Sequence, residues 1–179
     1  MKGHSLPGDI TYPQFVEIHN LRDAGGVRRY HTDVHMPSQS VAEHSWNMAM
    51  MCRILWPADL FVMMACLTHD IAEYWTGDVP SPAKWRWPEL RDQLAMAEAE
   101  IIEEHGARMP LDDLQKTRLR FLDLLELAWY SAECYAEGNR YARVIYQKVI
   151  AAVKDLCPDE ALGLVMALED FVGGFDGLP

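Results

Sequence analysis

Three polar residues interrupt an apolar helical pattern near the middle of the chain. His69, Asp70 and Glu73 follow the apolar run 60–67 and lie within about one helical turn of one another. A buried, unpaired Asp costs several kcal/mol through desolvation, and a bound metal ion would offset that cost. Glu73, at i+4 from His69, is placed to act as an acid or base on metal-bound water. The alternative is a buried His–Asp pair that is satisfied without a metal.

Two further polar residues fall in other predicted helices, at positions that a bundle would have to bury. His44 lies in the first turns of a helix that starts at Ser40, and Asp123 falls within the apolar run 121–125. Together with His69 and Asp70 they make a mixed nitrogen and oxygen set suited to zinc, manganese, iron or cobalt. A metal with open positions lowers the pKa of its bound water and makes a nucleophile.

A segment without helical or strand periodicity, residues 26–39, concentrates cationic and aromatic side chains in an otherwise acidic protein. Arg28, Arg29, His31 and His35 lie beside Tyr30. An Arg next to an aromatic ring suits a phosphate and a flat base, whereas a simply solvated loop is the alternative. We regard His31 and His35 as candidates for residues that line the substrate pocket, without assigning them a role.

Periodicity and capping signals predict an all-α, single-domain bundle of six to seven helices over residues 1–179, with no strand. Gly and Pro residues separate the predicted helices. Residues 76–82 form a turn-rich segment that follows the predicted helix 59–75. The predicted helical segments are 11–24, 41–55, 59–75, 89–105, 111–137, 141–156 and 160–172.

Composition narrows the class of protein. The formal net charge of -11 argues against binding to nucleic acid polymers or acidic membranes, which need clustered Lys and Arg. The sequence contains no apolar run near the roughly 20 residues that span a bilayer, and its N-terminus has no signal core. The four cysteines form no Cys-x-x-Cys pair. We therefore expect a cytoplasmic protein.

Several ordered blocks of the sequence resemble one family. His44, the pair His69-Asp70 and Asp123 are similar to the His…His-Asp…Asp signature of the HD-domain phosphohydrolases. The blocks 42–45, 69–73 and 76–82, with Lys84, resemble the 5′-deoxynucleotidase branch, and Arg29-Tyr30 stands where that branch has Arg-Trp. The resemblance runs from the first helix to about residue 135. It implies an all-helical enzyme that hydrolyses phosphate esters of deoxynucleosides through metal-activated water. It also implies a bacterial cell as the site of action, with the gene carried by the bacterium or by a phage.

The resemblance also implies a role for each matched residue. His44, His69, Asp70 and Asp123 would bind a divalent transition metal such as Zn, Mn or Co, with room for a second ion such as Mg. Glu73 and Asp78 would be catalytic, moving protons or positioning water. The expected substrate contacts are Arg29 and Lys84 to phosphate, together with Tyr30 and Pro82, and Gln39 is a weaker candidate for a contact to base or sugar. By geometry alone, Arg120, one turn before Asp123, would add a phosphate contact.

A subgroup of short phage enzymes in this branch removes triphosphate from dATP, and the compact length of the chain suits it. Tyr30 fits the aromatic residue that faces adenine there, while Thr32 replaces an aliphatic one. Base preference and the bond that is cleaved therefore stay open.

Other classes remain as alternatives. A carboxylate-bridged di-iron bundle would need paired Glu-x-x-His motifs, which the sequence lacks. A non-catalytic helical interaction module with a structural His/Asp cluster is the main alternative, and metal analysis would separate it from the enzyme. The many amphipathic helices, like the family resemblance, lead us to expect a homo-oligomer, either a dimer or a hexamer.

Overall fold

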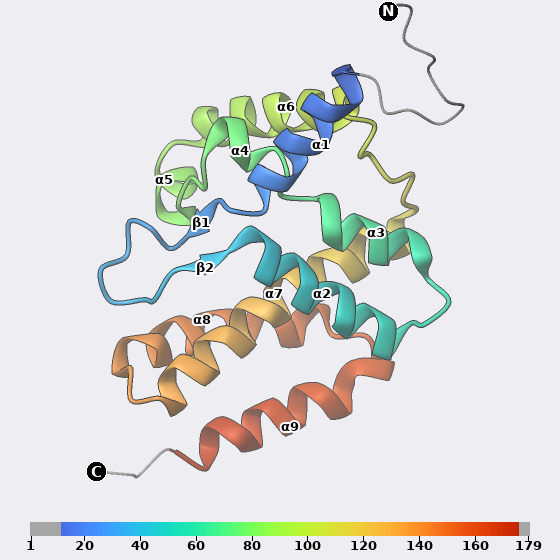
Figure 1. Cartoon of the computed structure of the whole chain (residues 1–179). Coiled ribbons are helices and arrows are strands. Elements are labelled where there is room, and N and C mark those ends of the chain that lie inside the picture. Colours follow the sequence, from blue (N-terminus) through green and yellow to red (C-terminus); the bar gives the residue numbers. More distant parts are fainter. Residues whose placement is uncertain (1–11, 176–179) are drawn as a thin grey trace, which may run out of the picture.

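Helix α7 (Asp113–Ala136) is the central element of the bundle (Figure 1). It contacts α2 (Val41–Leu55), α3 (Leu60–Thr68), α8 (Arg140–Leu156) and α9 (Leu162–Gly173). A short 3₁₀ helix, Asp159–Ala161, precedes α9. The computed structural model describes residues 12–175, so the predicted helix start at Thr11 lies outside the described residues. The all-α class is confirmed by these elements.

The remaining helices form a second group on one side of this bundle, at the top of Figure 1. They are α1 (Tyr12–Ala24), α4 (Glu73–Thr76), α5 (Ser81–Arg86) and α6 (Pro88–Glu104). Helix α4 contacts α1 and α6, and α5 contacts α6. Periodicity predicts the longer helices α1 and α6, but it does not predict the short helices α4 and α5 as separate elements.

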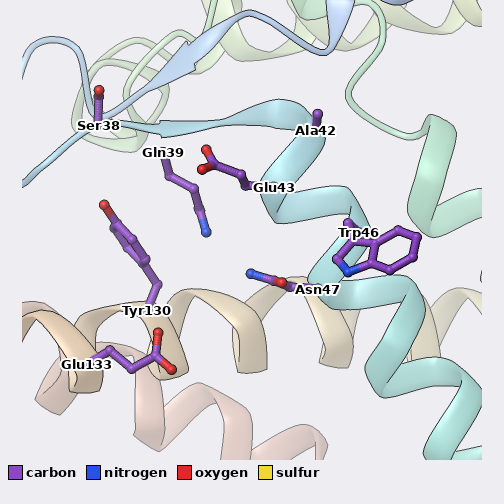
Figure 2. A pocket seen from close by; sticks show the side chains of 8 residues that line it. All are labelled: Ser38, Gln39, Ala42, Glu43, Trp46, Asn47, Tyr130 and Glu133. Atoms are coloured by element: carbon purple, nitrogen blue, oxygen red, sulfur yellow. The ribbon is translucent and has the colours of Figure 1, made fainter.

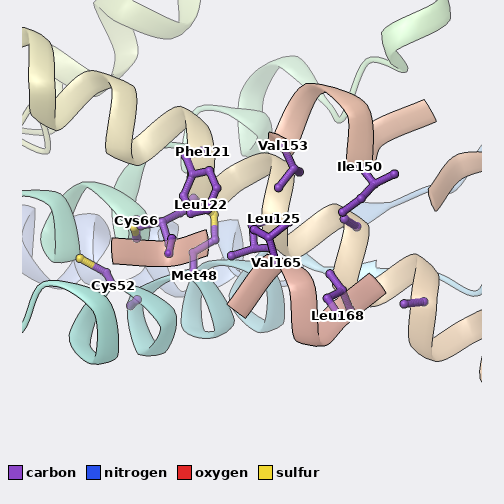
Figure 3. Packing of buried hydrophobic residues seen from close by; sticks show 14 of the residues in the cluster. Met48, Cys52, Cys66, Phe121, Leu122, Leu125, Ile150, Val153, Val165 and Leu168 are labelled. Carbon is purple, nitrogen blue, oxygen red and sulfur yellow. The ribbon is translucent and has the colours of Figure 1, made fainter. Parts of the chain in front are cut away.

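The hydrophobic core gathers around one face of α7 (Figure 3). Phe121, Leu122 and Leu125 recur at helical spacing and are each fully buried. Figure 3 shows the side chains that pack around them from the other helices: Met48, Cys52, Cys66, Ile150, Val153, Val165 and Leu168. The core therefore fixes α2 and α3 against α7, and these three helices carry or directly precede the predicted metal ligands.

The predicted helix 59–75 is not continuous, which corrects the sequence interpretation. Helix α3 ends at Thr68, and α4 begins at Glu73. Between them the hydrogen bonds span three residues, from Glu73 N–H to the Asp70 carbonyl and from Tyr74 N–H to that of Ile71. This tighter pattern replaces the α-helical ladder, so Glu73 is not one turn beyond His69 on the same helix.

Helix α3 is buried on one side only, although its composition is apolar throughout. Val62, Ala65 and Cys66 are buried, but another set of large apolar residues is exposed: Leu60, Phe61, Met64 and Leu67. Helix α3 therefore covers one side of α7. Self-association through such exposed residues stays a prediction.

A two-stranded antiparallel ribbon precedes α2, where no strand was predicted. Strands β1 (Arg28–Arg29) and β2 (Gln39–Ser40) pair Arg29 with Gln39. A strand of two residues is too short to show the alternation of side chains that identifies strands in a sequence. Only its pairing with a distant strand defines it. Ser40 then caps α2, and its capping box with Glu43 is confirmed.

Within residues 12–175, no helix has both the length and the apolar character needed to cross a membrane. All four cysteines carry free thiols.

Candidate metal centre

Three potential ligands from two segments lie together where α2 passes the end of α3. His44 comes from α2, and His69 and Asp70 directly follow α3. One ligand atom from each of these residues lies within 4.8 Å of the other two. Asp123 of α7 adds a fourth side chain, because its Oδ1 is 3.5 Å from His44 Nε2. The structure thus brings together all four predicted metal ligands; their role as ligands remains a prediction.

The two imidazole rings present one free nitrogen each to this cluster. His44 Nδ1 contacts Glu126 Oε2 at 2.5 Å, and His69 Nδ1 contacts the Cys66 carbonyl at 3.0 Å. Since these partners only accept hydrogen bonds, each Nδ1 carries a proton. The Nε2 atoms of both rings are buried and have no hydrogen-bond partner among the described residues. Buried, unpartnered nitrogens beside carboxylates fit a divalent metal ion.

Charge is concentrated around the cluster. Burial opposes a charge on His44, but contacts with Asp123 and Glu126 outweigh it and raise the pKa of His44 to about 9. Burial likewise opposes a charge on Asp123, yet His44, His69 and Arg29 hold its pKa below the ordinary range. The carboxylates therefore create a negative potential that a proton or a metal ion must neutralise.

Arg29 enters the cluster from strand β1. Its Nη1 donates to Asp70 Oδ2 at 3.0 Å, and its side chain is only 12% exposed. Although burial works against the charge, Asp70 and the other acidic groups raise the pKa of Arg29. A fixed guanidinium next to candidate metal ligands is suited to hold a phosphate oxygen.

Glu73 is a partly buried acid beside the cluster. Burial, followed by the charges of Asp70 and Asp78, raises the pKa of Glu73 to about 8. Its Oε2 is buried without a hydrogen-bond partner among the described residues. A carboxyl group with a pKa near neutrality can donate or accept a proton at physiological pH.

Asp78 holds the backbone of Tyr30 in an unusual conformation. Its Oδ2 accepts a hydrogen bond from Tyr30 N–H at 3.1 Å. Tyr30 has a φ of 60°, the left-handed region that side chains other than Gly rarely adopt. The Tyr30 ring stacks on that of Tyr130, with centroids 5.5 Å apart and an interplanar angle of 7°. Asp78 therefore positions the predicted base-contacting residue, and its catalytic role stays a prediction.

The other residues predicted to contact substrate lie around the cluster and are more exposed to solvent than Arg29. Lys84 of α5 is half-buried, and its charge opposes the upward pKa shifts of Glu73 and Glu98. Pro82 is exposed in the first turn of α5. Arg120 is 61% exposed and pairs with Asp123 through a 2.9 Å contact between Nη1 and Oδ2. Lys84 is thus close to the acids of the cluster, and Arg120 lies at its outer edge.

A family model described as "HD domain" matches residues 25–139. This span is more than half of the chain, and it contains every side chain of the cluster. The chain belongs to the HD-domain family.

Known HD-domain relatives agree with this assignment. A dATP triphosphohydrolase of cyanophage S-2L is 36% identical over an alignment of 99 residues, and the match covers 51% of this chain and 55% of that protein. The matched region therefore spans about half the length of that curated relative.

Two solved structures share the fold of this HD-domain chain. The PH0347 protein from Pyrococcus horikoshii OT3 has a TM-score of 0.66 at 16% identity, covering 89% of this chain and 98% of that one. The cyanophage S-2L HD phosphohydrolase DatZ, bound to dA and one catalytic Zn²⁺, has a TM-score of 0.63 at 22% identity, covering 87% and 96%. At these identities the likeness confirms the helical fold.

Sequence reasoning missed one buried acid of the HD domain, Glu126. This residue of α7 is 1% exposed and contacts His44 Nδ1. Asp123 was selected because it falls in an apolar run, and Glu126 one turn later in the same run gives the same signal. Gln39, predicted to contact base or sugar, is buried, and its Nε2 donates to Glu126 Oε1 at 2.7 Å. The Gln39 amide nitrogen therefore already donates an intramolecular hydrogen bond.

The two loop histidines lie in different places. His31 Nδ1 is 3.8 Å from Asp78 Oδ2, beside the site. The ring of His35 instead stacks on Tyr141 of α8 at 4.0 Å between centroids. His31 therefore stays a pocket candidate, whereas His35 anchors the loop against α8.

An open pocket of about 680 Å³ adjoins the metal centre between β2, α2 and α7 (Figure 2). Its lining is Ser38, Gln39, Ala42, Glu43, Trp46, Asn47, Tyr130 and Glu133. This set contains two carboxylates and no Lys or Arg, so it does not suit a phosphate. Arg29 and Lys84 are better candidates for binding a phosphate than the residues of this pocket.

Proposed function

We propose that this HD-domain chain is a metal-dependent phosphohydrolase that acts on deoxynucleotides. The observation that carries the proposal is the pair of buried, unpartnered Nε2 atoms of His44 and His69, which face Asp70 and Asp123. Arg29, fixed beside Asp70, adds a phosphate-binding group at the same place. A divalent transition metal held by these ligands would supply Lewis-acid activation of water and neutralise charge on phosphoryl oxygens.

The residues of the chain would do the rest of the work. Arg29 and Lys84 would hold the phosphate oxygens in line for attack. Burial and the charges of Asp70 and Asp78 raise the pKa of Glu73, so we assign it the role of the general acid that protonates the leaving oxygen. The Tyr30 ring would pack against the base of the nucleotide.

We further infer dATP as the preferred substrate and triphosphate as the product. The support for this finer assignment is the identity to the dATP triphosphohydrolase of cyanophage S-2L across the matched region. Thr32 and the tyrosine at position 30 are the residues of this chain most directly concerned with base choice. A second divalent ion, such as Mg, would accompany the triphosphate.

The deciding experiment is a panel of deoxynucleoside mono-, di- and triphosphates, assayed with Zn²⁺, Mn²⁺ or Co²⁺ and again after treatment with a chelator. Free phosphate, pyrophosphate and triphosphate are resolved among the products. We expect metal-dependent turnover of dATP with release of triphosphate. Release of phosphate from monophosphates would assign a 5′-nucleotidase instead. A chain that binds no metal and hydrolyses no member of the panel would be a helical interaction module.

A further inference from the structure

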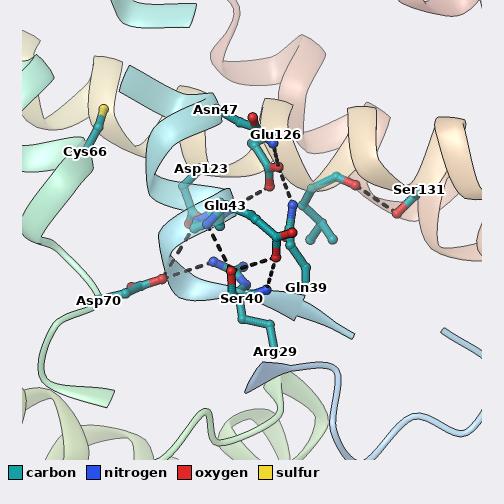
Figure 4. Close-up of polar contacts among 12 residues, drawn as sticks. Arg29, Gln39, Ser40, Glu43, Asn47, Cys66, Asp70, Asp123, Glu126 and Ser131 are labelled. Carbon is teal, nitrogen blue, oxygen red and sulfur yellow. Dashed lines mark hydrogen bonds and ion pairs between the residues drawn. The ribbon is translucent and has the colours of Figure 1, made fainter. Parts of the chain in front are cut away.

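Glu126 is held by three polar side chains directly behind the metal centre (Figure 4). Its Oε2 contacts His44 Nδ1 at 2.5 Å. Its Oε1 accepts hydrogen bonds from Gln39 Nε2 at 2.7 Å and from Asn47 Nδ2 at 3.1 Å. Both oxygens of this buried carboxylate are therefore occupied, each by a different kind of donor.

The three donors come from two elements, and Glu126 comes from a third. Gln39 lies on β2, His44 and Asn47 lie on α2, and Glu126 lies on α7. His44 and Asn47 are one helical turn apart, so they reach the same carboxylate from one face of α2. The arrangement consequently fixes the position of α2 relative to α7 at the level of the metal centre.

These contacts determine which nitrogen of His44 is free. A carboxylate can only accept, so the proton of a neutral His44 ring lies on Nδ1, and the lone pair lies on Nε2. That Nε2 is 3.8 Å from Asp70 Oδ2 and 3.5 Å from Asp123 Oδ1, and it has no hydrogen-bond partner among the described residues. The neutral form of the ring therefore presents its free nitrogen to the candidate metal site.

We propose that Glu126 is a positioning residue of the metal centre and that Gln39 and Asn47 hold it in place. In this role Glu126 fixes the tautomer and orientation of His44, which increases the affinity of Nε2 for a divalent ion. The inference rests on the proposed function only in requiring that His44 binds a metal. It gives Gln39 a supporting role in place of the substrate contact predicted from sequence.

The test compares Glu126→Gln with Glu137→Gln, which removes the same charge from an exposed position at the end of α7. A Gln side chain has one acceptor and one donor group, so it cannot keep all three contacts of Glu126. Either it loses the amides of Gln39 and Asn47, or its own amide faces Nδ1 and favours the opposite tautomer of His44.

Zn²⁺ affinity is measured by competition with a chelating dye, and the visible spectrum of bound Co²⁺ reports ligand geometry. We expect Glu126→Gln to weaken Zn²⁺ binding about 10- to 100-fold and to change the Co²⁺ spectrum. Glu137→Gln should match the wild type in both measurements. Thermal unfolding in chelator shows whether each metal-free variant is folded. A folded Glu126→Gln variant with wild-type Zn²⁺ affinity and Co²⁺ spectrum would overturn the proposal.

Asn47→Ala provides a second variant, because Asn47 is exposed and its loss removes only one of the two amides that hold Glu126. We expect it to weaken Zn²⁺ binding in the same direction by a smaller factor. If Glu126→Gln does not fold, unchanged Zn²⁺ affinity in Asn47→Ala would overturn the proposal. Because no substrate is present, a wild-type chain that binds metal without hydrolysing nucleotides contradicts only the proposed function. A wild-type chain that binds no metal contradicts both.

Discussion

Arg29 and Gln39 are direct partners across the β1–β2 ribbon, and their side chains reach two different parts of the metal centre. Arg29 donates to Asp70, a candidate ligand, and Gln39 donates to Glu126, which contacts the candidate ligand His44. Residues directly opposite in an antiparallel pair project from the same face of the ribbon. A ribbon of two residues per strand thus links Arg29, the proposed phosphate-binding group, to Gln39, which contacts the proposed support of His44.

Removal of a candidate ligand should abolish metal binding. We expect His69→Ala to lose stoichiometric metal and to lower turnover by roughly 1000-fold or more, because the ligand set loses one of its two imidazoles. Metal content is measured by elemental analysis after purification. His19→Ala is the matched control, since His19 is an exposed histidine paired with Asp23. Wild-type metal content in His69→Ala would contradict the assignment of His69 as a ligand.

Loss of Glu73 should affect turnover without affecting metal content. As the proposed general acid, Glu73 contributes to the chemical step, so Glu73→Gln should lower kcat by about 100-fold or more. In the wild type, kcat should fall as the pH rises through the pKa of Glu73, which the bound cation lowers from its raised value in the metal-free protein. The variant should lose this dependence. A metal-free preparation of Glu73→Gln would instead identify Glu73 as a ligand.

The raised pKa of Glu73 also predicts how the metal-free protein responds to pH. The folded protein holds this proton up to about pH 8, whereas the unfolded chain releases it near the ordinary value of 4.5. Between these values the folded state binds more protons, so its stability should fall as the pH rises. The melting temperature in chelator, recorded from pH 5 to pH 8, should decrease more steeply in the wild type than in Glu73→Gln. Parallel curves for the two proteins would rule out a raised pKa.

Lys84 should contribute to phosphate binding. We expect Lys84→Gln to raise KM for a deoxynucleoside triphosphate about 10-fold, because one charge-assisted contact is lost. Arg86→Gln removes a cation two residues later from an exposed position and should leave KM unchanged. Steady-state kinetics of the two variants decide the matter, and equal KM values would place Lys84 outside the site.

The cap of α2 should contribute to stability. The Ser40 hydroxyl accepts from Glu43 N–H at 3.2 Å and donates to Glu43 Oε2 at 2.6 Å. Ser40→Ala removes both contacts and should lower the free energy of unfolding by about 1 kcal/mol. Urea denaturation measures the change, with Ser38→Ala in the preceding loop as the control. An unchanged midpoint for Ser40→Ala would show that the cap is energetically unimportant.

The sequence by itself determined the helical class, the extent of the long helices and the residues with metal-ligand chemistry. The spacing of apolar residues in α7 and the capping box at Ser40 are local signals, and local hydrogen bonding and side-chain periodicity produce them. His44 and Asp123 were recognisable because polar groups in apolar helices need a partner.

Only the tertiary structure decided how those residues meet. The Arg29–Gln39 pairing and the Glu126–His44 contact depend on partners far apart in sequence, 82 residues in the last case. Helical periodicity reports which face of a segment is buried, but not which buried groups face one another. That arrangement follows from packing α2 and α3 on α7, which places the free nitrogens of two histidines beside two carboxylates.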